Sequence, residues 1–390
     1  MPVVNRIADF APDMEGWRRH LHAHPELSFD CEQTARFVVE QLKSFGVDEI
    51  HEGIAKTGVV AVIRGQGESA RRVGLRADMD ALPIEEETGA PHASTVPGKM
   101  HACGHDGHTT MLLGAARYLA ETRNFAGEVV LLFQPAEEQG GGGEVMVQEG
   151  VMDRFGVSEV YALHNAPMET EGHILTAPGP VMAGVGEFEV TVHAAGGHAA
   201  YPHQAQDPLP PALAMIQAVD SVTARNHDPA KALVLGVTQM STASNANNVI
   251  GTWVRFSGTI RYYEKDVADL AISRLREIVS GTAAAFGVTA DISFEMGYPP
   301  TINHAEQAQF AVDVAREVVG DGAVVADAPP VMGAEDFSYM LESRPGAYLM
   351  LGQGDTAMCH QAAYDFNDAI SPVGASFFAR LVERAQPVGG

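Results

Sequence analysis

The first half of the chain alternates short apolar runs with segments of helical spacing. Runs rich in β-branched residues predict buried strands at residues 58–64, 73–78, 128–133 and 159–163. Between these runs, residues 17–45 show helical spacing with a break at His24-Pro25, and residues 108–121 place apolar side chains on one helical face. Strands and helices that alternate in this way predict an α/β fold with a mainly parallel central sheet flanked by helices.

A different pattern begins after Pro180. The elements predicted there are a half-buried strand, a helix, two strands, a long helix and a last strand, at residues 185–193, 207–224, 233–240, 253–260, 266–286 and 288–294. The order β-α-β-β-α-β is that of the split ferredoxin-like unit. Residues 301–390 then return to the α/β pattern of the first half.

The chain is long enough for two hydrophobic cores, with 390 residues. We therefore predict a discontinuous first domain, residues 1–183 and 298–390, and a ferredoxin-like domain inserted into it, residues 184–297. A small inserted sheet exposes strand edges that can pair with another copy of the chain. We expect a homodimer, or a dimer-based oligomer, through the inserted domain.

Composition excludes several classes of protein. The formal charge of −25 disfavours binding to nucleic acid or to an anionic membrane surface, since both require a basic surface. No run approaches the roughly 20 apolar residues of a membrane span. The first residues lack a basic flank followed by an apolar run, so we expect no secretory signal. Three cysteines are too few for a disulfide framework and predict a cytoplasmic protein.

Polar side chains follow the predicted strands at the points where the strands end. Asp78 and Asp80, Glu137 and Glu138, His164, and Cys359-His360 each follow a strand, and a loop before a helix supplies His101, Cys103, His105 and His108. Ligands bind at the carboxyl ends of the strands in open α/β sheets. Five separate segments should therefore bring Asp, Glu, His and Cys side chains to one edge of the sheet.

Thiolate, imidazole and carboxylate groups together suit a late divalent ion, namely Zn, Mn, Co or Ni. The candidate ligands are more numerous than one tetrahedral ion needs, whereas two ions about 3.5–4 Å apart would use them all. A cysteine thiolate can bridge such a pair. We expect His92, His101 and His108 to lie outside the ligand set and His20, His22 and His24 to belong to a surface or packing helix.

At this point the residues resemble a known family. Residues 100–108, MHACGHDGH, resemble the metal motif of the M20 metallopeptidase family, in its amidohydrolase branch of hippurate hydrolases, N-acyl-amino-acid deacylases and plant auxin-conjugate hydrolases. The similarity runs nearly end to end, through motifs at residues 18–22, 25–27, 76–83, 133–138, 163–165, 196–203, 332–337 and 364–368.

The resemblance implies a role for each residue. Cys103 would be the bridging thiolate, with His105 and His164 completing one metal site and Glu138 and His360 the other. Glu137 resembles the general base of the family. The inserted domain would be a lid and dimerisation domain. In it, His198 would stabilise the oxyanion, either in the site of its own subunit or in that of a partner. Asn248 and Arg261 would bind a carboxylate of the substrate. We expect Asp80 and Asp106 to support the ligands from behind.

The sequence departs from the family pattern around these residues. Cys359 precedes His360 where an apolar residue is usual, and Gln361 follows where a proline is common. Gln139 replaces a more usual glycine, and Gly251-Thr252 stands where Pro-Asp is common. None of these changes removes a predicted ligand, but they alter the surroundings of the substrate.

The sequence thus predicts a dimetal amidohydrolase that cleaves N-acyl amino acids, such as benzoyl or acetyl derivatives, to a carboxylic acid and an amino acid. A dipeptidase or carboxypeptidase of the same family, and a hydrolytic deaminase of an aromatic amine, would use the same site. Two further alternatives are a cysteine hydrolase with Cys103 as nucleophile and a metal-dependent binding protein. The presence of Glu137 beside all the candidate ligands disfavours a protein that only binds.

Overall fold

The computed structural model describes residues 3–389 and divides into two compact units. The first unit contains residues 1–181, 301–330 and 336–390, of which the described part is discussed here, and the second contains residues 182–300 with the short segment 331–335. The bounds of the second unit lie within a few residues of the predicted insert, 184–297. The segment 331–335 lies outside the prediction because it joins the second unit by tertiary contacts, such as the hydrogen bond from Ala183 N to Gly333 O.

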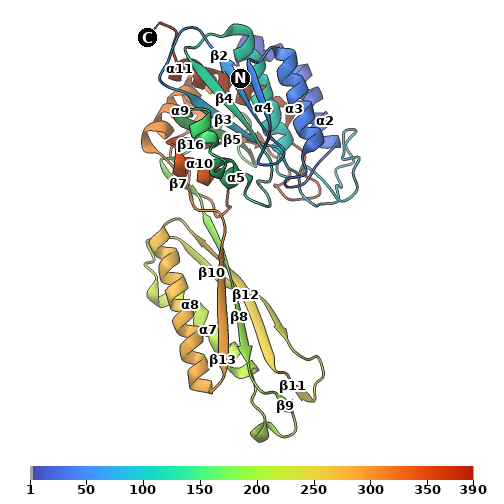
Figure 1. Ribbon diagram of the computed structural model, residues 1–390, viewed down its shortest axis with the longest axis vertical. Coiled ribbons are helices and arrows are strands. Elements are labelled where there is room, and N and C mark those ends of the chain that lie inside the picture. Colours follow the sequence, from blue (N-terminus) through green and yellow to red (C-terminus); the bar gives the residue numbers. More distant parts are fainter. Residues whose placement is uncertain (1–2, 390) are drawn as a thin grey trace. The chain divides into compact units, whose positions relative to one another are not determined.

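The first unit is built on an eight-stranded sheet in the order β1-β2-β4-β3-β5-β16-β6-β15 (Figure 1). Its strands are β1 (Glu49–Ile54), β2 (Gly58–Arg64), β3 (Val73–Asp78), β4 (Glu128–Gln134), β5 (Glu159–Pro167), β6 (Ile174–Leu175), β15 (Val324–Val325) and β16 (Gly346–Gly354). The central strands β4, β3, β5 and β16 are parallel to one another. In contrast, β2 pairs antiparallel with β1 and with β4, and β6 pairs antiparallel with β16. The predicted α/β class with a mainly parallel sheet is confirmed.

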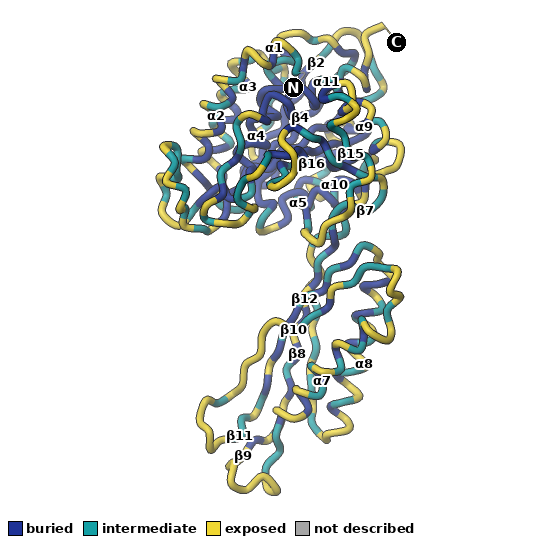
Figure 2. Tube along the Cα trace, turned by 180° about the vertical axis from the view of Figure 1, so that it is seen from behind, coloured by how far each residue is buried: buried dark blue, intermediate teal, exposed yellow. Residues whose placement is uncertain are grey.

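Helices cover both faces of this sheet (Figure 1). They are α1 (Asn5–Ala8), α2 (Ala11–Ala23), α3 (Glu32–Phe45), α4 (His105–Thr122), α5 (Gly142–Gln148), α6 (Val151–Arg154), α9 (Ala305–Val319), α10 (Phe337–Ser343) and α11 (Ser371–Ala385). Alternate residues of each central strand, such as Val73, Leu75 and Ala77, join side chains of α4 and α11 in one buried core. Figure 2 shows these strands and α4 as the most deeply buried part of the unit. A small ribbon of β7 (Gly179–Met182) and β14 (Thr301–Asn303) completes the unit.

The second unit has the predicted order β-α-β-β-α-β. Its elements are β8 (Gly184–His193), α7 (Leu209–Ser221), β10 (Leu233–Thr242), β12 (Trp253–Tyr262), α8 (Lys265–Phe286) and β13 (Thr289–Met296). The strands form an antiparallel sheet in the order β10-β12-β8-β13, and α7 and α8 bury one of its faces. This is the ferredoxin-like arrangement expected from the sequence. Within residues 3–389, no helix combines the length and the apolar composition needed to cross a bilayer.

Candidate metal centre

The structure brings all five predicted ligands together at the carboxyl ends of the central strands. Cys103, His105 and His164 offer ligand atoms that lie within 4.8 Å of one another, and so do Cys103, Glu138 and His360. His164 lies on β5, Glu138 follows β4, and His360 follows β16. Cys103 and His105 lie where the chain enters α4. Two ligand sets thus share one sulfur atom, as a pair of ions bridged by a thiolate would require.

Gly104 separates these two ligands and has a left-handed φ of +101°. A Cβ atom there would come 2.2 Å from Asn165 Oδ1 and 2.6 Å from Tyr364 Oη. Only glycine fits at this point. The tight turn allows Cys103 and His105 to approach the same place from the loop and from the first residue of the helix.

The imidazole of His164 is oriented as metal-binding histidines usually are. Its Nδ1–H donates to the backbone O of Asn165 at 2.6 Å, which leaves Nε2 unprotonated in the neutral ring. Nε2 lies 3.5 Å from the sulfur of Cys103. Burial and the neighbouring His108 lower the pKa of His164 well below its ordinary value, so the ring stays neutral and its lone pair is available.

His105 supplies a test of whether a cation fits. Both of its ring nitrogens are buried without a well-formed hydrogen bond to any described residue, as is Oε1 of Glu138. Buried polar atoms of this kind are rare unless a ligand satisfies them. Burial opposes a charge on the ring, yet Asp78, Asp80 and Glu138 raise the pKa of His105 well above its usual range. The cluster therefore stabilises positive charge, and its thiol, imidazole and carboxylate groups fit divalent metal ions.

The second ligand set opens toward solvent. His360 Nε2 lies 3.3 Å from Glu138 Oε1, and the His360 side chain is 54% exposed, against 9% for Glu138. Against the effect of burial, the contact with His360 lowers the pKa of Glu138. His360 and Ala136 both have left-handed backbones, with φ of +67° and +59°. Non-glycine residues adopt this conformation at a cost and often do so at functional sites.

Asp80 holds the loop that carries the two glutamates. Its carboxylate oxygens accept hydrogen bonds from the backbone N–H groups of Glu137 and Glu138, at 3.0 and 3.1 Å. Asp80 Oδ1 also lies 3.4 Å from Nδ1 of His105. One buried carboxylate thus positions both a ligand and the predicted base, whose Oε2 lies 4.0 Å from His105 Nε2.

Asp106 faces away from the ligands toward a buried cluster of charges. His22 Nδ1 lies 2.8 Å from its carboxylate, and Arg18 lies 3.8 Å away. His22 Nε2 also lies 3.3 Å from Glu86. The sequence predicted that His22 belongs to a surface or packing helix; it lies on α2, and its side chain is fully buried and ion-paired. Asp106 therefore anchors the start of α4 to α2, one residue beyond His105.

This cluster gives the stability a pH dependence. Burial favours the neutral form of His22, but its bonds to Asp106 and Glu86 raise its pKa from 6.5 to about 9. The stabilisation is complete below pH 6.5 and disappears as the pH rises through 9, because the folded protein binds this proton more tightly than the unfolded chain does. We expect the free energy of unfolding to fall over this interval by about 3 kcal/mol. Urea unfolding at several pH values would measure it; His22→Gln should flatten the dependence, whereas the exposed-site control His203→Gln should keep it.

A second buried chain of polar groups was not predicted as a unit. Arg76 donates to Asp78 at 2.6 Å, and Asp78 Oδ1 lies 2.6 Å from His108 Nδ1. His108 Nε2 lies 2.7 Å from Asn165 Oδ1, and Asn165 donates to Tyr364 Oη at 2.8 Å. His108 lies outside both ligand sets that share Cys103, although its ligand atom lies within 4.8 Å of those of Asp78 and His105. The position of Asn165 directly after His164 was the one sequence signal that could have marked it.

The lid residues predicted to contact the substrate lie in two separate places within the second unit. His198 lies on a two-residue strand, β9 (Gly197–His198), which pairs with β11 (Val249–Ile250), and Ala199 N donates to Asn248 O at 3.0 Å. Arg261 lies near the opposite end of β12, paired with Val185. Trp253 begins β12 shortly after β11, and Arg261 lies eight residue steps farther along the same strand. These steps correspond to about 26 Å. Asn248 and Arg261 of one chain therefore lie toward opposite ends of β12.

His198 is exposed and presents a defined donor. Its Nδ1 accepts a hydrogen bond from Ala200 N–H at 3.0 Å. In the neutral ring the proton then lies on Nε2. Within residues 3–389, Nε2 has no hydrogen-bond partner. The side chain thus offers an N–H group to an incoming negative oxygen.

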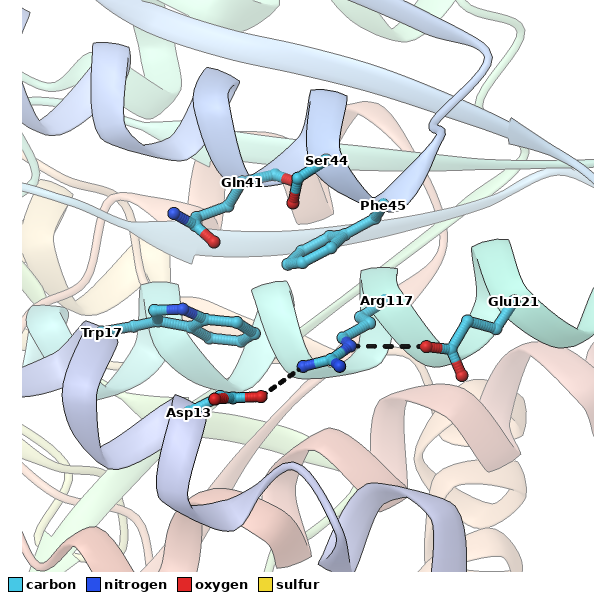
Figure 3. A pocket seen from close by; sticks show the side chains of 7 residues that line it. All are labelled: Asp13, Trp17, Gln41, Ser44, Phe45, Arg117 and Glu121. Carbon is cyan, nitrogen blue, oxygen red and sulfur yellow. Dashed lines mark hydrogen bonds and ion pairs between the residues drawn. The ribbon is translucent and has the colours of Figure 1, made fainter.

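A hollow of about 390 Å³ between α2, α3 and α4 lies apart from these residues (Figure 3). Trp17 and Phe45 line it with ring centroids 5.4 Å apart, and Arg117 binds Asp13 at 2.7 Å and Glu121 at 3.4 Å. Its charged groups pair with one another, and none of the predicted site residues lines it. We assign it no role in the chemistry.

Comparison with known proteins places this geometry in context. The model of peptidase family M20/M25/M40 matches residues 74–384. The hippurate hydrolase of Campylobacter jejuni is 36% identical over 98% of both chains, and the N-acyl-L-amino acid amidohydrolase of Geobacillus stearothermophilus is 44% identical over 78% of this chain and 81% of its own. The structure of YXEP from Bacillus subtilis, a dinuclear metal binding peptidase, superposes with a TM-score of 0.84 at 31% identity, covering 96% of this chain and 98% of that one.

Proposed function

This chain belongs to peptidase family M20/M25/M40, and from that premise we propose that it hydrolyses the amide bond of N-acyl amino acids, releasing a carboxylic acid and an amino acid. The observation that carries the proposal is the pair of ligand sets that share Cys103, with Glu137 beside them. Similarity to a hippurate hydrolase and to an N-acyl-L-amino acid amidohydrolase supports this substrate class.

We propose that the cofactors are two divalent ions, each Zn, Mn, Co or Ni. Cys103, His105 and His164 would hold one ion, and Cys103, Glu138 and His360 the other. Such ions polarise a carbonyl group and lower the pKa of water toward about 7. The ring nitrogens of His105 and Oε1 of Glu138, which are buried without a well-formed hydrogen bond, support this assignment.

Glu137 would act as the general base and then as the general acid. Its backbone is fixed by Asp80, and its side chain is only 9% exposed. A carboxylate held at this place can accept the proton of the attacking water as the water adds to the amide carbon. It can then donate the proton to the leaving nitrogen, which departs as the amino group of the product.

Arg261 would bind the free carboxylate of the amino-acid part. Its guanidinium donates to Thr259 Oγ1 and, at 3.2 Å, to the backbone O of Ile260. Among residues 3–389 no carboxylate lies within ion-pair distance of it, although the charge of Glu187 acts on it from farther away. A half-buried guanidinium without a carboxylate partner can bind one bidentately. Burial lowers the pKa of Arg261, although the group stays charged at neutral pH.

His198 and Asn248 would act in a partner's site. The distance between their ribbon and Arg261 prevents one small substrate from touching both within a single chain. A symmetric dimer removes the conflict, because the ribbon of one copy can serve the site that contains Arg261 of the other. The exposed ribbon and the open edges of the sheet, β10 and β13, support a homodimer through this unit. We also propose a cytoplasmic location, which the small number of cysteines supports.

The alternatives differ in their products and in their need for metal. A carboxypeptidase or dipeptidase would release an amino acid from a peptide, and a deaminase would release ammonia. A cysteine hydrolase would use the contact between Cys103 and His164 Nε2 at 3.5 Å, and it would keep its activity when metals are removed.

The deciding experiment measures product release by metal-stripped protein, before and after addition of Mn, Zn, Co or Ni. The panel should contain N-benzoyl, N-acetyl and longer N-acyl amino acids, dipeptides, an aromatic amine and the methyl esters of the best substrates. We expect metal-restored release of an amino acid from one acyl class, with the esters cleaved poorly because they lack the carboxylate. Full activity of the stripped protein, or release of ammonia alone, would contradict the proposal.

A further inference from the structure

Two of the three cysteines lie side by side at the metal centre. His360 N–H donates to the backbone O of Ala102 at 2.7 Å, which holds the segment after β16 against the segment before α4. Next to this bond, the sulfur of Cys359 lies 3.7 Å from the backbone O of Cys103. The side chains of Cys103 and Cys359 are also in contact with each other.

Cys359 has no part in either ligand set, although it adjoins the ligand His360. Its sulfur lies 3.9 Å from Nδ2 of Asn165, the residue that follows the ligand His164. Cys103 and Cys359 are both partly exposed, whereas Cys31 is fully buried elsewhere in the core. The first two cysteines therefore lie closer to solvent than the third.

We propose that Cys103 and Cys359 form an oxidation site, in which a hydroperoxide converts the neighbouring thiols into a disulfide and so removes the ligand shared by both metal sites. One of the two sulfur atoms, as a thiolate, attacks the peroxide oxygen and becomes a sulfenic acid, with release of water or an alcohol. The other thiol then attacks that sulfur, the S–O bond breaks, an S–S bond forms and a molecule of water leaves. The peroxide accepts the two electrons that the thiols lose.

The consequence follows from the ligand geometry. A sulfur atom in a disulfide carries no thiolate charge, so both sites lose their common ligand at once. Bound ions should in turn protect Cys103, because a coordinated thiolate is a poorer nucleophile than a free one. Oxidation and metal binding are then mutually exclusive, and a dithiol reductant restores the ligand. The metal part of this inference rests on the proposed function, whereas formation of the disulfide does not.

The test treats the full chain with hydrogen peroxide, in metal-stripped form and after loading with Zn, and then maps peptides by mass spectrometry under non-reducing conditions. We expect one intramolecular cross-link between the peptides of Cys103 and Cys359, formed faster in the stripped protein, with one of the three thiols left free. Metal content, measured by plasma emission spectrometry, should fall with cross-linking and recover after reduction by dithiothreitol and re-addition of Zn.

Two variants serve as controls. Cys359→Val should keep metal content and basal turnover while preventing the cross-link, so that peroxide leaves Cys103 as a sulfenic or higher oxidation product. Cys31→Ala should cross-link as the natural protein does. A protein that keeps Cys103 and Cys359 alkylatable after peroxide treatment, or that links them only between chains, would overturn the inference.

The experiment also separates this inference from the proposed function. A cross-link that forms at the same rate with and without Zn, and that leaves the bound metal in place, would retain the disulfide but refute Cys103 as the shared ligand. Absence of the cross-link with normal metal-dependent hydrolysis would refute only the oxidation site.

Discussion

Replacing Glu137 by Gln is expected to lower kcat by about 10³-fold while the protein keeps its divalent ions. The amide has the size of the carboxylate but cannot accept a proton. Asp80 holds this loop through the backbone N–H groups, which the substitution does not change. The measurement is kcat for the best N-acyl amino acid, together with metal content.

Two further Glu→Gln substitutions serve as controls for the effect of Glu137→Gln. Glu138→Gln should lose metal as well as activity, because Glu138 belongs to a ligand set. Glu169→Gln removes an exposed carboxylate from the loop after β5 and should change neither. Loss of metal from Glu137→Gln would make Glu137 a ligand, in agreement with its proximity to His105 and Glu138, and near-native kcat would remove it from the mechanism.

Mixing two inactive variants is expected to restore activity. His198→Ala lacks the proposed oxyanion donor, and Glu137→Gln lacks the base. If each site of a symmetric dimer takes its ribbon from the partner, a mixed dimer contains one site with both residues intact. Random exchange of subunits should then give about a quarter of the natural activity, because half of the dimers are mixed and each has one working site.

The controls use the same mixture. Each variant alone should stay near its own low rate, and activity should rise with the time allowed for subunit exchange. If mass spectrometry detects mixed dimers but the activity of the mixture never exceeds the summed activities of the two variants, His198 acts in the site of its own chain. A monomer at the assay concentration, measured by analytical ultracentrifugation, would contradict the dimer itself.

Periodicity and turn residues accounted for the central elements because these are strongly apolar. The strands β2 to β5 and β16 form the buried core, so their sequences are nearly continuous apolar runs. The break at His24-Pro25 correctly separated α2 from α3. The strand β1 escaped prediction because its residues 49–54 are largely polar and lie at the edge of the sheet, where one face is open to solvent. Helix α4 begins three residues earlier than predicted, at His105, because Gly104 allows the helix to start directly after the turn.

For the site, residue type and position at strand ends placed the candidate ligands at one edge of the sheet. The family resemblance then narrowed them to Cys103, His105, Glu138, His164 and His360. Contacts between segments far apart in the sequence could not be predicted from residue type and position. Nothing in the sequence near Asp106 shows that its carboxylate binds His22, which lies 84 residues earlier. The separation of Asn248 from Arg261 likewise depends on which end of β12 each one occupies, and a motif does not contain that information.

The place of β16 in the sheet has a consequence for synthesis of the protein. This strand lies between β5 and β6, although about 170 residues of chain separate it from them. While the ribosome is still making the middle of the chain, β5 has an unpaired apolar edge. Such edges promote aggregation. The nascent chain must therefore remain partly folded until the segment from Gly346 onward emerges, and it is during this interval that a chaperone would protect it.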